Sequence, residues 1–83
     1  MRTDVLIAGV DAAQSKSLEQ DLRQTLADLR ANDIATVALL PSDAQGRWDL
    51  GVKRNGGWSV VWFDAKVDEL ASHARATLRR SVE

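Results

Sequence analysis

Cysteine is absent from this sequence, and histidine, proline and methionine each occur once. Without cysteine the chain is not a disulfide scaffold, and a structural zinc site built on thiolates is excluded. Any metal site would have to be assembled from carboxylates and His73. We therefore expect neither a metal nor another cofactor.

Long apolar runs are absent as well. Stretches such as residues 5–10 and 34–40 are far shorter than the roughly 20 residues that a membrane-spanning helix needs. No basic segment followed by an apolar one opens the chain, as a secretory leader would. We expect a cytoplasmic protein without a membrane partner.

The sequence also lacks an excess of charge of one sign, because it has 11 basic and 12 acidic residues and a net charge of -1. Such a balance does not attract nucleic acid through bulk electrostatics. Hydrophobic residues make up 45% of the chain and charged residues 28%, the proportions of a globular protein. The 83 residues have room for one core, so we expect a single domain over residues 1–83.

Periodic apolar patterns predict the elements of the first half. Residues 5–8 form a β-rich run that ends at Gly9, which indicates a strand. A helix begins between Asp11 and Ser17, each of which offers a capping box. Its apolar stripe consists of Leu18, Leu22, Leu26 and Leu29. The nearly continuous apolar run of residues 34–40 predicts a strand that is buried on both faces.

A β-hairpin is the strongest local prediction in the second half. Residues 47–53 and 57–63 alternate on either side of Arg54, Asn55 and Gly56. A three-residue loop over 54–56 would gather the large apolar side chains on one face, namely Trp48, Leu50, Val52, Trp58, Val60 and Trp62. A two-residue turn at Asn55 and Gly56 would divide them between two faces. We favour the three-residue loop.

The last segment predicts a second amphipathic helix. Asp64 is the expected N-cap, and the apolar stripe that follows consists of Val67, Leu70, Ala71, Ala74, Leu78 and Val82. The complete pattern predicts an α+β fold with the order β-α-β-β-β-α, in which two amphipathic helices pack on a four-stranded mixed sheet.

The hairpin register has consequences for burial. We expect all three tryptophans in the core, so that Trp62→Ala costs roughly 3–5 kcal/mol of stability. The pattern leaves open whether the helices cover one face of the sheet or both, and we favour both helices on the tryptophan face. Val61 and Phe63 would then point the other way and be exposed.

One stretch faintly resembles a phosphate-binding loop, because a strand ending at Gly9 leads into Ser15, Lys16, Ser17 and a helix. The required spacing is not met, since Gly9 lies seven residues before Lys16 and no second glycine precedes the lysine. We therefore interpret the stretch as the capped start of a helix.

The titratable residues of the last helix also have a structural interpretation. His73 follows Glu69 by four residues, a spacing typical of a contact on a helix surface. Asp64, Asp68 and Glu69 would lie in the first helical turn, where negative charge is favoured by the helix dipole. We expect no catalytic residue and no enzyme.

The absence of a catalytic motif favours a non-catalytic protein-interaction module, such as a small intracellular adaptor, inhibitor, immunity or anti-defence protein. Its partner would be another protein or a second copy, which makes a homodimer possible. The predicted partner surface consists of Val61 and Phe63, because exposed apolar pairs mark interaction sites. Lys53 and Arg54 at the hairpin tip belong to the same surface.

An RNA-binding domain is the alternative. From Ala12 onward the order α-β-β-β-α resembles that of double-stranded RNA-binding domains, and Lys53 and Arg54 with the C-terminal arginines could contact phosphates. In those domains the last helix begins with lysines, whereas residues 64–69 carry three acids and one lysine. Nucleic acid is therefore the less favoured partner.

Overall fold

The computed structural model describes residues 2–83, and its elements follow the predicted order. They are β1 (Asp4–Ile7), α1 (Ala12–Asp28), β2 (Ile34–Pro41), β3 (Arg47–Arg54), β4 (Gly57–Asp64), a short 3₁₀ helix (Val67–Glu69) and α2 (Leu70–Val82). The predicted α+β class and the β-α-β-β-β-α order are confirmed.

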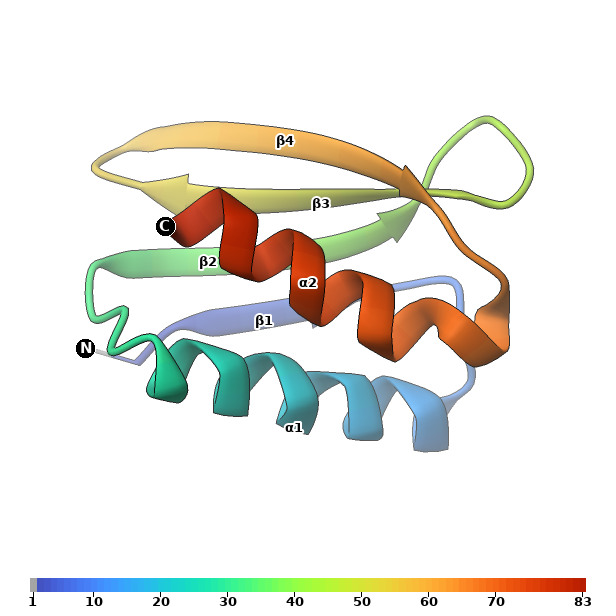
Figure 1. The fold of residues 1–83 in the computed structure, drawn as a ribbon, viewed down its shortest axis with the longest axis horizontal. Helices are drawn as coiled ribbons and strands as arrows, with labels where there is room; N and C mark the ends of the chain where they lie inside the picture. Colours follow the sequence, from blue (N-terminus) through green and yellow to red (C-terminus); the bar gives the residue numbers. More distant parts are fainter. Residues whose placement is uncertain (1) are drawn as a thin grey trace.

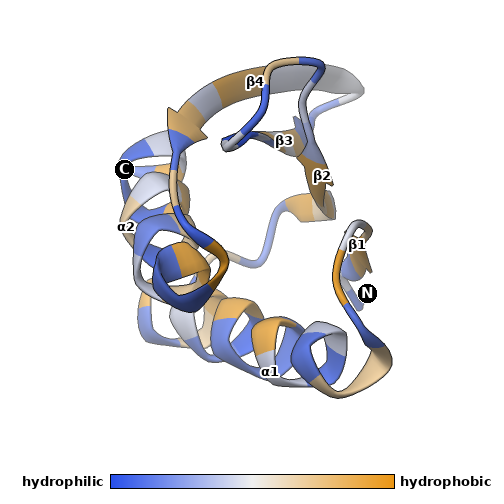
Figure 2. Ribbon diagram, turned by 90° about the vertical axis from the view of Figure 1, so that its right-hand side faces the viewer, coloured by the Kyte–Doolittle hydropathy of each residue, from blue (hydrophilic) through white to orange (hydrophobic). Residues whose placement is uncertain are grey.

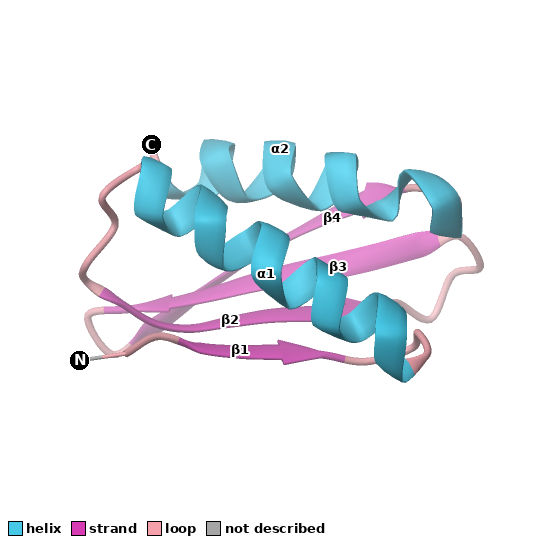
Figure 3. Cartoon of the chain, turned by 90° about the horizontal axis from the view of Figure 1, so that it is seen from below, coloured by secondary structure: helices cyan, strands magenta, loops and turns pink. Residues whose placement is uncertain are grey.

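The strands form one mixed sheet in the order β1-β2-β3-β4. β1 runs parallel to β2, to which it is connected through α1, and the other neighbours are antiparallel. Both helices cover the same face of the sheet, as Figures 1 and 3 show. Seen end-on, the sheet curves around the helices, so its helix-free face is convex (Figure 2).

The core lies between the helices and the inner face of the sheet. The helices contribute leucines and an alanine four residues apart, which brings them to one side of each helix: Leu18, Leu22 and Leu26 from α1, and Leu70, Ala74 and Leu78 from α2. The strands contribute alternate residues, namely Val37, Leu39, Trp48, Leu50, Val52 and Phe63. Each of these side chains is at most 8% exposed.

The two helices begin differently. The side chain of Asp11 caps α1, since its Oδ1 accepts a hydrogen bond of 2.8 Å from the Gln14 amide. Asp64 does not cap α2, contrary to the prediction, because β4 continues through this residue. The ladder extends even further, as the Ala65 amide donates to the Gly46 carbonyl at 3.0 Å.

The predicted three-residue hairpin loop is wrong. β3 and β4 pair with Arg54 opposite Gly57 and Lys53 opposite Trp58, which leaves a two-residue turn of Asn55 and Gly56. Both turn residues are left-handed, with φ of 52° and 80°. This is the combination that a type I′ turn requires, and its twist matches that of the two strands.

The shorter turn reverses the burial predicted for β4. Trp48 is buried as predicted, but Trp58 and Trp62 are 53% and 57% exposed and point away from the helices. Phe63, which was expected to be exposed, is only 8% exposed and belongs to the core. One residue fewer in the turn exchanges the two faces of a paired strand, because successive side chains alternate.

Candidate functional site

The convex side of the sheet carries a large apolar surface that no helix covers. We call this surface the outer face, and it consists of Leu6, Ala38, Leu40, Trp58, Val60 and Trp62. All of them except Ala38 are between 43% and 62% exposed. The five exposed side chains leave on the order of 500 Å² of largely apolar area in contact with water, comparable to the largest patch of a typical monomer.

The strand register produces this continuity. Leu6 lies opposite Ala38, Ala38 opposite Gly51, and Gly51 opposite Val60, so one row crosses all four strands. A neighbouring row runs from Leu40 through Asp49 to Trp62. Side chains in such rows are close enough to form one surface.

Gly51 gives Trp58 its place on this face. A Cβ atom at Gly51 would lie 3.2 Å from two ring carbons of Trp58, so the indole lies directly over the glycine backbone. Beside the ring is a shallow hollow of about 260 Å³, lined by Ala38, Leu40, Asp49, Gly51, Trp58 and Val60. Its lining is mainly apolar, which suits an apolar side chain of a partner.

Charges around the outer face are of mixed sign. The Arg47 guanidinium stacks 3.9 Å from the centre of the Trp62 ring, and its Nε lies 3.5 Å from Asp64 Oδ1. By strand alternation Asp4, Asp49 and Lys53 also point to this side. The outer side of the sheet thus carries the three carboxylates of Asp4, Asp49 and Asp64. It also carries two cationic groups, those of Arg47 and Lys53.

The outer face ends at the free edge of β4, since the only described strand that pairs with β4 is β3. A two-residue turn closes on a hydrogen-bonded pair, and bonded and non-bonded pairs alternate from there. The bond from Ala65 to Gly46 fits this alternation at the far end of the ladder. The amides and carbonyls of Trp58, Val60 and Trp62 therefore face away from β3.

The four residues of the predicted partner surface do not form one surface. Phe63 is in the core, and Val61 lies on the helix side near the sheet edge, where it is 39% exposed. Lys53 lies beside Trp58 on the outer face. Arg54 points to the other side and binds Asp33, with 2.7 Å between Nε and Oδ2. The hydrogen bond from Arg54 holds the pKa of the Asp33 carboxyl below its usual value.

Arg75 and Arg79 do not form a free basic strip with Lys53 and Arg54. Arg75 lies 3.3 Å from an Asp21 carboxylate oxygen and Arg79 lies 3.9 Å from one of Asp28, both on α1. These pairs link the two helices on the side of the molecule opposite the outer face. Their positive charge is thus balanced within the chain.

His73 lies on the exposed surface of α2 beside a core residue. Its ring stacks on Phe63 with 6.1 Å between centroids and 6° between planes, and so covers that core residue. Within residues 2–83, no group of three histidine or carboxylate side chains could hold a metal ion.

The loop at Gly9 packs against Pro41 and leaves no space beside the glycine. Gly9 has a φ of 85°, and a Cβ there would meet Pro41 Cγ at 2.8 Å. Lys16 follows inside α1, and the amide of Gln14 is taken by the Asp11 carboxylate. This arrangement favours the interpretation as a capped helix start.

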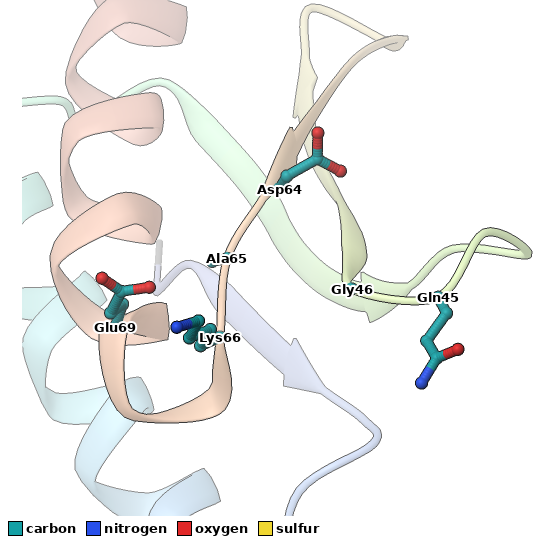
Figure 4. A pocket seen from close by; sticks show the side chains of 6 residues that line it. All are labelled: Gln45, Gly46, Asp64, Ala65, Lys66 and Glu69. Atoms are coloured by element: carbon teal, nitrogen blue, oxygen red, sulfur yellow. The ribbon is translucent and has the colours of Figure 1, made fainter.

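A separate hollow of about 340 Å³ lies where the β2–β3 loop meets the segment between β4 and α2. Its lining consists of Gln45, Gly46, Asp64, Ala65, Lys66 and Glu69. Figure 4 shows the side chains of Asp64 and Gln45 pointing away from each other. Because its polar groups do not converge on one point, the hollow is a weaker candidate than the outer face.

Sequence reasoning placed Trp58, Val60 and Trp62 in the core and so missed the outer face. The signal that could have found it is the dipeptide Asn55-Gly56, the preferred sequence of a two-residue type I′ turn. The alternation of six large apolar side chains favours the other register and is the stronger pattern over the two strands.

Comparisons with known proteins support the fold alone. No family model matches the chain, and no curated protein matches it. Among solved structures, the N-terminal domain of Protein Y from Thermus thermophilus is similar, with a TM-score of 0.50 and 18% sequence identity over 98% of this chain and 99% of that one. Within residues 2–83, no helix has the length and apolar character needed to cross a membrane.

Proposed function

We propose that this chain is a non-catalytic protein-interaction module that binds another protein chain on the outer face. The observation that carries the proposal is the exposure of Trp58, Val60 and Trp62 together with Leu6 and Leu40 on a face without a helix. The largest apolar patch of a protein is often a functional one, and tryptophans contribute a large share of binding energy at interfaces. The cytoplasmic location expected from the sequence remains part of this proposal.

The mixed charge favours a protein over a nucleic acid. The exposed Trp58 beside Lys53, and the exposed Trp62, could in principle stack on bases, but single-stranded nucleic acid also requires a continuous cationic groove. Here Asp49 and Asp64 lie on the same side as Lys53, and Arg47 is engaged with Trp62. An interface of apolar side chains with a rim of both signs is typical of protein partners.

A matched pair of variants tests this surface. Val60→Asp puts a charge in the middle of the outer face, whereas Val67→Asp makes the same change at a similarly exposed valine outside it, at 56% against 62%. The three proteins serve as baits in cell extract after mild crosslinking, and the recovered proteins are quantified by mass spectrometry. We expect the wild type and Val67→Asp to recover a common partner, and Val60→Asp to recover roughly tenfold less of it. An unpaired charge buried at an interface costs more than ~1.4 kcal/mol, which corresponds to a factor of about ten in affinity.

Equal recovery by all three baits would contradict the proposal. The nucleic-acid alternative is tested by titrating single-stranded RNA and DNA while tryptophan fluorescence is measured at physiological salt. We expect no saturable quenching. Quenching that saturates, and that Lys53→Gln abolishes, would overturn the proposal in favour of base stacking on Trp58.

A further inference from the structure

We infer that the partner is a second copy of this chain, joined along the free edge of β4 so that two sheets become one continuous sheet. This inference rests on the proposed function, since it names the partner of the same surface. Its argument uses the backbone at the sheet edge, the side chains beside it and the curvature of the sheet.

The edge formed by β4 lacks the protection that natural edge strands usually have. β4 has eight residues, and neither a proline, a lysine nor a shift in its register with β3 interrupts it. Proteins normally blunt long edges with such features, because open amides and carbonyls pair with other chains. β1 at the opposite edge is only four residues long and begins with Asp4.

The direction of the backbone groups specifies how two β4 strands would pair. The amides and carbonyls of Trp58, Val60 and Trp62 face the free edge, and Val60 is the one nearest the middle of the strand. An antiparallel pair related by a twofold axis at Val60 sets Val60 opposite Val60 of the other copy. Trp58 of each copy then lies opposite Trp62 of the other.

This pairing joins the outer faces of the two copies. Residues directly opposite in an antiparallel pair project to the same side of the sheet, so two Trp58–Trp62 pairs would flank Val60. Cross-strand aromatic pairs of this kind add roughly 0.2–1 kcal/mol each beyond the backbone bonds. All helices of both copies remain on the opposite side.

Charges at the ends of β4 suit the antiparallel arrangement. The end near Asp64 carries two carboxylates, those of Asp49 and Asp64, against Arg47, while the hairpin end carries Lys53. Antiparallel pairing brings the acidic end of one copy next to the basic end of the other. The helix side of the edge is also accessible, because Ser59 and Val61 are both exposed there.

The convex shape of the outer face disfavours the other symmetric arrangement, in which two outer faces stack on each other (Figure 2). Two convex surfaces touch over a small area. Edge pairing avoids this restriction, but its contact is a strip along one strand, and small interfaces, below about 1,200 Å² in total, are typical of transient complexes. We therefore expect a reversible dimer rather than a permanent one.

Sedimentation equilibrium of the full chain over a range of concentrations tests the inference. We expect the average mass to rise from that of one chain towards that of two. Val60→Pro removes an amide that faces the free edge and is not used by β3, so it should leave the fold intact by circular dichroism and abolish the dimer. Val60→Thr keeps the amide and the branched shape, and should retain the dimer.

Crosslinking gives a second readout that does not depend on the proline variant. The chain has no cysteine, so Val60→Cys introduces a single thiol. Opposite Cα atoms in a hydrogen-bonded pair are about 5.5 Å apart, within the range that a disulfide spans. We expect Val60→Cys to form a covalent dimer in dilute solution with oxidised glutathione, and the exposed control Val67→Cys to stay largely monomeric.

Two results would overturn the inference. A wild-type chain that remains monomeric at millimolar concentration has no second copy as partner, although the outer face could still bind another protein in the bait experiment. A dimer that persists in Val60→Pro, or that Val60→Cys does not crosslink, is formed by a different surface.

Discussion

At the residue scale, exposure divides the three tryptophans into two kinds. Trp48 is 5% exposed and packs within the core, whereas Trp58 and Trp62 lie on the outer face. The Arg47 guanidinium stacks on the Trp62 ring, and the Trp58 ring packs on the backbone of Gly51. The same residue type thus serves folding at one position and is available for binding at two others.

The stability of two alanine variants should reflect this division. Trp48→Ala removes a buried aromatic and should lower the free energy of unfolding by roughly 3–5 kcal/mol. Trp62→Ala, for which the sequence suggested a similar loss, should cost about 1 kcal/mol or less, since most of its surface is in water already. Urea denaturation at low protein concentration, where self-association adds little, gives both values. Equal losses for the two variants would contradict the exposed position of Trp62.

At the element scale, the hairpin turn determines which side chains of β4 lie on the outer face. Asn55 and Gly56 both adopt left-handed conformations, and this is what limits the loop to two residues. Asparagine tolerates that conformation better than other residues with a Cβ atom, and glycine tolerates it best. The exposure of Trp58 and Trp62 therefore depends on two residues that are not part of the outer face.

Substitutions at Asn55 test the turn directly. Asn55→Ala should destabilise the chain by about 1 kcal/mol, because a left-handed conformation costs alanine roughly that much. Asn55→Gly should be neutral or slightly stabilising. Thermal unfolding followed by circular dichroism measures both. The three-residue loop would require the left-handed conformation only at Gly56, so a neutral Asn55→Ala would point back to that loop.

At the scale of the whole molecule, one side of the sheet is closed by helices and the other is open. The helices bury the inner face completely enough that Leu22, Leu39, Leu50, Leu70 and Leu78 have no exposed surface. Ion pairs between α1 and α2 lie along that closed side. Apolar surface is therefore concentrated on the outer face.

Fluorescence should detect this asymmetry in solution. Two of the three tryptophans are more than half exposed, so the emission of dilute protein should be red-shifted and readily quenched by acrylamide. The double variant Trp58→Phe with Trp62→Phe leaves Trp48 alone, and its emission should be blue-shifted and shielded. If the double variant were quenched as easily as the wild type, Trp48 would not be buried.

Local pattern was sufficient to predict the elements and their order. Leucines four residues apart define the buried side of α1, and alternation defines the strands, because these periods follow from the geometry of each element alone. The parallel connection through α1 and the hairpin after it then restrict the topology to few alternatives.

Local pattern was not sufficient to predict which side chains of β4 face the helices. Whether Trp58 or Phe63 is buried depends on the parity of the turn, and one residue more or less reverses it. Both registers place apolar side chains on both sides of β4, and gathering the large side chains of β3 and β4 on one face favours the register that the structure does not have. The sequence by itself determined the elements and the α+β class. Only the tertiary structure decided which side of the sheet the helices cover, and therefore which apolar residues remain available to a partner.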